Sequence, residues 1–76
     1  MKLSEAAEKG KNRYWVSAQV RRNPGAIDQW FVMLVNSESK QFMLASDDDD
    51  PIVSSDLNTF INLLGQLGIK EFTVFT

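Results

Sequence analysis

Hydrophobic and polar residues alternate over residues 13–22, which read RYWVSAQVRR. A period of two residues is typical of a strand with one buried face. The alternation places two sets of side chains on opposite faces: Tyr14, Val16, Ala18 and Val20 on the buried face, and Trp15, Ser17, Gln19 and Arg21 on the other. The sequence NPGA comes next and predicts a type II turn with Pro24 and Gly25 at its centre.

The next two apolar segments complete a predicted meander of three antiparallel strands. Residues 29–36, QWFVMLVN, are apolar at six successive positions and rich in β-forming types, which favours a central strand covered on both faces. Its inward face is not determined, because a shift of one residue exchanges the two faces. After the polar turn SESK, the segment QFMLA predicts a third strand with Phe42 and Leu44 opposed to Gln41, Met43 and Ala45.

Two helices and a last strand are predicted outside the meander. Apolar residues recur at helical spacing at Leu57, Phe60, Ile61, Leu64 and Leu67, which predicts a helix over about residues 56–67, capped by Ser55 and ended by Gly68. A short N-terminal helix is predicted between a Ser4 cap and a Gly10 stop. The tail KEFTVFT, residues 70–76, alternates and predicts a fourth strand.

These elements predict a single α+β domain spanning residues 1–76, in the order α-β-β-β-α-β. The long helix is expected to pack across one face of the sheet. Because it connects the third and fourth strands, the fourth runs in the direction of the first. We expect it beside the first strand, which gives the strand order 3-2-1-4.

Composition narrows the function classes. The 76 residues are 43% apolar and include no histidine and no cysteine, so the commonest general base and the best nucleophile are both missing. We therefore expect no enzyme activity and no cofactor. The lack of cysteine favours a cytoplasmic protein, since small secreted domains usually depend on disulfides. No targeting segment and no apolar run of about 20 residues is present, so we expect no membrane association.

Charge is distributed unevenly, with a net +4 over residues 1–22 and a net −6 over residues 23–76. Basic residues flank an aromatic in the first strand, a combination that sheet-based nucleic-acid binders use for phosphate contact and base stacking. The candidate contacts for a single strand or RNA are Lys11, Arg13, Trp15, Arg21 and Arg22. The order α-β-β-β-α also resembles that of double-stranded RNA-binding domains. Those domains carry a lysine-rich motif where this chain has DDDDPIVSSD, so we do not assign it to that family.

Four consecutive aspartates, Asp47, Asp48, Asp49 and Asp50, follow the third strand. They do not form a calcium loop of the EF-hand type, because position six would be Ile52 and position twelve Asn58 instead of Gly and Glu. We expect no metal site. A solvated loop before the long helix is the simplest interpretation. The alternative is an acidic inhibitor that docks these four side chains in a basic groove.

The pattern leaves a surplus of apolar side chains on the second face of the sheet. A small monomer rarely exposes a large apolar patch, so this face predicts contact with another protein, most simply a homodimer. The alternative is that the N-terminal helix covers it. We therefore expect a non-enzymatic protein-binding or regulatory module, with these candidate interface residues: Trp15, Ser17, Gln19, Arg21, Met43 and Phe75.

Overall fold

The computed structural model describes residues 1–75, except for the side chain of Ile27. The elements are α1 (Leu3–Lys11), β1 (Trp15–Asn23), β2 (Ala26–Asn36), β3 (Gln41–Met43), β4 (Val53–Ser54), α2 (Leu57–Gln66) and β5 (Phe72–Val74). The predicted α+β class and element order are confirmed, with β4 as an addition. The predicted last strand reaches Thr76, which lies outside the described residues. Within residues 1–75, neither helix has the length and apolar content needed to cross a membrane.

The strands form one mixed sheet in the order β3-β2-β1-β5, and β4 also pairs with β2. β1 and β2 are antiparallel, and β5 lies parallel to β1, in the position predicted for the last strand. β3 and β4 pair with β2 on the same side of it, at Met33–Met43 and Phe31–Val53. The third strand is therefore interrupted between Met43 and Val53 by the segment that carries the aspartates.

The helix α2 covers one face of this sheet and provides the centre of the core. It starts one residue later than predicted, because Asp56 is the cap and its Oδ1 accepts a hydrogen bond from Asn58 N at 2.9 Å. It ends as predicted before Gly68, whose φ of +77° is readily adopted only by glycine. Its apolar side packs into one cluster with both central strands, and the largest fully buried side chains of that cluster are Val20, Val32, Leu34, Leu44, Phe60, Leu64 and Leu67.

The start of β1 contains a bulge that the alternating pattern does not predict. Trp15 pairs with Asn36 and Ser17 pairs with Val35, so Val16 has no residue opposite it. Trp15 consequently points to the helix-covered side and is 6% exposed, whereas Val16 is 52% exposed. The predicted faces of Trp15 and Val16 are both wrong, because one extra residue in a strand exchanges its faces.

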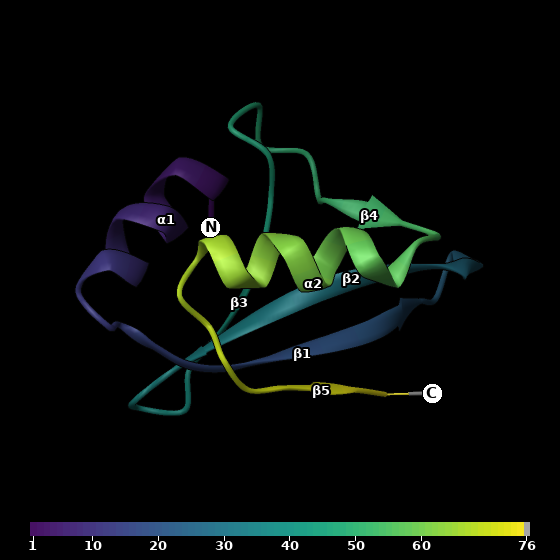
Figure 1. The fold of residues 1–76 in the computed structure, drawn as a ribbon. Coiled ribbons are helices and arrows are strands. Elements are labelled where there is room, and N and C mark those ends of the chain that lie inside the picture. Colours follow the sequence, from purple (N-terminus) through teal and green to yellow (C-terminus); the bar gives the residue numbers. More distant parts are fainter. Residues whose placement is uncertain (76) are drawn as a thin grey trace.

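The buried Trp15 holds α1 on the same side of the sheet as α2 (Figure 1). Its Nε1 donates a hydrogen bond to the carbonyl of Ala6 at 3.0 Å, and Ala6 belongs to the same core as α2. Gly10 is not the predicted helix stop; it lies inside α1, where an added Cβ would overlap the carbonyl of Leu67. The alternative in which the N-terminal helix covers the second face of the sheet is therefore wrong.

The hairpin turn between β1 and β2 is not the predicted type II turn. A type II turn needs a positive φ at Gly25, but among residues 1–75 Gly68 is the only glycine with a positive φ. Gly25 N instead donates a hydrogen bond to Asn23 Oδ1 at 3.0 Å. The turn is closed by a side chain, as in an Asx turn.

The close approach of α1 to α2 makes Gly10 sensitive to any added atom. We expect Gly10→Ala to destabilise the protein by about 1–3 kcal/mol, the usual cost of overpacking. Gly65→Ala is the matched control, since no atom lies within 4 Å of its added Cβ. We expect this control to stabilise the protein by about 0.5–1 kcal/mol, because it removes a helical glycine. Urea unfolding followed by tryptophan fluorescence measures both changes, and equal midpoints for Gly10→Ala and the parent would contradict the helix contact.

Candidate protein-contact surface

The side chains that point away from both helices form three rows across the sheet, and we call this surface the outer face. The register of the strands sets the members of each row side by side. The first row is Val53, Phe31, Arg21 and Phe75; the second is Met43, Met33, Gln19 and Thr73; the third is Gln41, Val35, Ser17 and Glu71. No element of residues 1–75 covers these rows (Figure 1).

The outer face is apolar on one half and polar on the other. The half formed by β2, β3 and β4 carries Phe31, Met33 and Val35, which are half-buried, beside Met43 and Val53, which are 41% and 38% exposed. A shallow hollow of about 250 Å³ opens on this half, between Phe31, Met43 and Val53, with Asn23, Pro24 and Pro51 at its edge. The half formed by β1 and β5 is polar except for Phe75 and the bulged Val16, which is 52% exposed. The continuous apolar stripe therefore lies on β2, β3 and β4.

Arg21 is fixed on the polar half by two contacts. Its Nε and Nη2 both donate to Gln19 Oε1, at 2.9 and 2.6 Å, and its guanidinium lies 4.7 Å from the centre of the Phe75 ring. A cation over an aromatic face is attracted by the ring quadrupole. The Arg21 charge and the exposed Phe75 ring therefore form one ordered unit at one end of the outer face.

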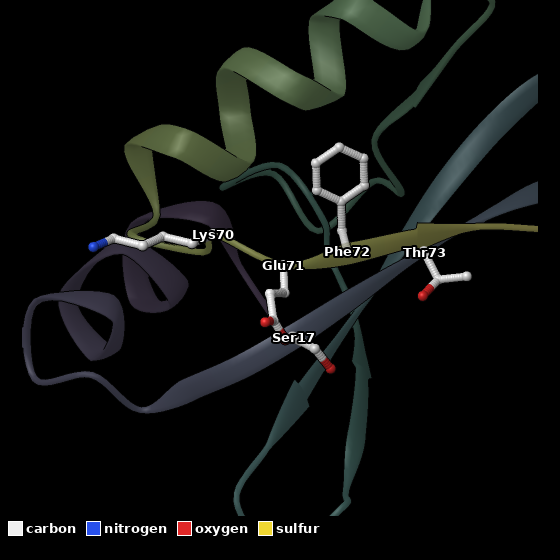
Figure 2. A pocket seen from close by; sticks show the side chains of 5 residues that line it. All are labelled: Ser17, Lys70, Glu71, Phe72 and Thr73. Atoms are coloured by element: carbon white, nitrogen blue, oxygen red, sulfur yellow. The ribbon is translucent and has the colours of Figure 1, made fainter.

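Glu71 lies at the other end of the polar half, beside a second hollow of about 440 Å³. Figure 2 shows Glu71, Ser17 and Thr73 on one side of the sheet and Phe72 pointing to the opposite side, toward α2. Glu71 comes directly before β5 and lies beside Ser17 of β1, because Ala18 N donates to the Glu71 carbonyl at 3.3 Å. Within residues 1–75, no group of three or more acidic, histidine or cysteine side chains could hold a metal ion.

Most of the predicted interface residues meet on this surface. Ser17, Gln19, Arg21, Met43 and Phe75 all lie on the outer face. Trp15 does not, because the bulge buries it. The prediction did not include Val53, which reaches the outer face through β4, a strand of two residues that is too short to produce a period in the sequence.

The predicted nucleic-acid contacts do not form one surface. Trp15 is buried and so has no ring face free for stacking. Lys11 Nζ forms an exposed ion pair with Glu8 Oε2 of the same helix at 3.7 Å. Arg13 lies in the exposed turn that follows α1. Arg21 and Arg22 stand at the far end of β1 on opposite faces, with Arg22 4.5 Å from the centre of the Trp30 ring on the helix side. Nucleic-acid binding through this set remains a prediction, without the continuous basic stripe that it requires.

The aspartate loop has a structural role on the helix side of the sheet. Asp47 Oδ1 accepts a hydrogen bond from Ser4 N at 3.0 Å, and no side chain of α1 itself caps that end. This backbone bond lowers the pKa of the Asp47 carboxyl, and the Ser4 side chain and the Lys2 charge add to the effect. Ser46 closes the loop, since its N donates to the Asp50 carbonyl at 2.7 Å and its carbonyl accepts from Asp49 N at 2.9 Å. Docking of Asp48, Asp49 and Asp50 into a basic groove remains a prediction.

Asp47 should therefore contribute to the stability of the folded protein, whereas Asp48 should not. A depressed carboxyl pKa contributes stability that is present above the ordinary value of about 3.9 and is lost as the pH falls through the folded value. We expect Asp47→Ala to lower the melting temperature at pH 7, and the difference from the parent to shrink at pH 3. Asp48→Ala, an exposed neighbour, is the control. Circular dichroism melts at both pH values measure this, and equal effects of the two substitutions would contradict the cap.

Comparisons with known proteins identify no relative. No family model, no curated protein and no solved structure matches the chain. The outer face, and not a likeness to another protein, therefore carries the functional inference.

Proposed function

We propose that the protein is a non-enzymatic protein-interaction module that associates with a second copy of itself through the outer face. The observation that supports this most strongly is the position of α1. With both helices on one side of the sheet, no described element of residues 1–75 covers the apolar stripe on the other side (Figure 1). Sheets commonly bury such a face against another sheet, about 10 Å away.

The size of the surface fits a partner of the same kind. The molecule measures 33 × 26 × 21 Å along its principal axes, so its broadest side is about 33 by 26 Å. Specific interfaces bury about 800 Å² on each partner. A second copy presents the same outer face, so the two surfaces match in extent.

The energetics favour a reversible dimer over an obligate one. Completing the burial of a partly exposed Phe, Met or Val contributes up to about 1 kcal/mol. The outer face offers six such side chains per copy: Phe31, Met33, Val35, Met43, Val53 and Phe75. Their sum over two copies is similar to the association cost of about 4–15 kcal/mol. We therefore expect the dimer to form as the protein concentration rises.

The chemistry of the surface supports binding over catalysis. The sequence contains no histidine and no cysteine. The hydroxyls of Ser17 and Thr73 border the second hollow beside one carboxylate, Glu71, and have no imidazole to activate them as nucleophiles (Figure 2). The aromatic and methionine side chains of the outer face are instead types that are enriched in protein interfaces.

Introducing a charge at the centre of the outer face tests this proposal. We expect Met33→Lys to weaken self-association by about tenfold or more, because the lysine would be desolvated between two apolar stripes. Ile61→Lys is the matched control: Ile61 is an apolar residue, 48% exposed, on α2 in the opposite layer, and its replacement should leave association unchanged. Size-exclusion chromatography with light scattering over a concentration series measures both variants. A monomeric parent, or equal effects of the two substitutions, would contradict the proposal.

A further inference from the structure

We infer that the two copies are related by a two-fold axis that lies in the interface and runs across the strands, through the row Met43, Met33, Gln19 and Thr73. This inference rests on the proposed self-association and adds the arrangement of the two copies. In this arrangement each residue of the middle row meets its own counterpart. The first row of one copy then faces the third row of the other.

Two symmetric arrangements keep the strands of the facing sheets aligned, as sheet packing prefers. In one, the two-fold axis runs across the strands, so every strand faces its own counterpart. In the other, the axis runs along the strands, so β3 and β4 face β5 of the partner and β2 faces β1. The distribution of apolar and charged side chains on the outer face distinguishes between them.

The apolar stripe favours the axis across the strands. This axis places the stripe of β2, β3 and β4 over the same stripe of the partner, with Met33 and Met43 at the centre and Phe31 facing Val35. This axis leaves two apolar side chains of each copy over polar ones, Val53 over Gln41 and Phe75 over Glu71. The other axis leaves four: Phe31 over Arg21, Met33 over Gln19, Val35 over Ser17 and Met43 over Thr73. Burial of polar groups without partners is costly.

The charges favour the same axis. Arg21 stands in the first row and Glu71 in the third, both on the polar half of the outer face. The axis across the strands brings the first row over the third, so Arg21 of each copy approaches the Glu71 carboxylate of the other. The axis along the strands keeps Arg21 in its own row, beside the same cation of the partner. Opposite charges that face each other stabilise one register of an interface, and like charges that face each other destabilise the alternative.

Cysteine cross-linking tests the axis directly, because the chain has no cysteine of its own. Met43 and Val53 are matched sites, since both lie at the same side of the sheet and they are 41% and 38% exposed. With the axis across the strands, residue 43 faces its counterpart. Facing sheets lie about 10 Å apart on average, and a disulfide joins such a pair by drawing the two sheets locally closer, as in immunoglobulin domains. Val53 stands one row away from the axis, which displaces it from its counterpart by about 13 Å along the strands. A disulfide needs Cα atoms within about 7 Å.

We therefore expect Met43→Cys to form a covalent dimer on mild oxidation and Val53→Cys to stay largely monomeric. Gel electrophoresis with and without a reducing agent measures both. An axis along the strands would leave residue 43 about 14 Å from its counterpart, so neither variant would cross-link. Failure of Met43→Cys to cross-link in a protein that still dimerises by light scattering would overturn the axis and leave the proposed function standing. A monomeric parent would overturn both.

Discussion

The hydrogen bond from Trp15 Nε1 to the Ala6 carbonyl is the interaction on which the rest of the arrangement depends. The bulge at Val16 turns the Trp15 ring under α1. There the centre of the Trp15 ring lies 4.8 Å from that of Tyr14 and 5.8 Å from that of Phe42, and both pairs are edge to face. A buried indole needs an acceptor for its N–H, and here α1 supplies it. Both helices consequently lie on one face of the sheet. The opposite face keeps its apolar stripe exposed, and that exposure is the basis of the proposed function.

The outer face and the aspartate loop now have separate roles. The loop interrupts the third strand, and its first carboxylate caps α1 through Ser4 N. The acidic segment therefore helps to hold α1 in place on the helix side, away from the surface proposed for self-association. A test of acidic docking has to retain Asp47 and replace only Asp48, Asp49 and Asp50; otherwise loss of the cap and loss of a partner contact would have the same effect.

The sequence predicts those parts of the fold that depend on local periodicity. The apolar spacing of α2, the alternation of β1 after Ser17 and the position of β5 beside β1 all agree with the structure. The errors have nonlocal causes. The bulge at Val16 is stabilised by an acceptor on α1, and Gly10 is required by the approach of the Leu67 carbonyl. The period of two predicts the outer positions of β1 after Ser17 and of β3, and it fails at Trp15, where the bulge breaks it. It leaves the inward face of β2 open, because both faces of that strand are apolar, so only the structure assigns Phe31, Met33 and Val35 to the outer face.

Burial of the outer face between two copies can be measured directly on the methionines of the unmodified chain. Met33 and Met43 lie on the outer face. Met1 lies beside β3, where its amine donates to the Met43 carbonyl at 3.0 Å, but its side chain packs against the core on the other side of the sheet. Hydrogen peroxide oxidises accessible methionines to sulfoxides, and mass spectrometry locates each product. We expect oxidation of Met43 to slow as the protein concentration rises, while oxidation of Met1 keeps its rate. An oxidation rate of Met43 that does not change with concentration would contradict burial of the outer face between two copies.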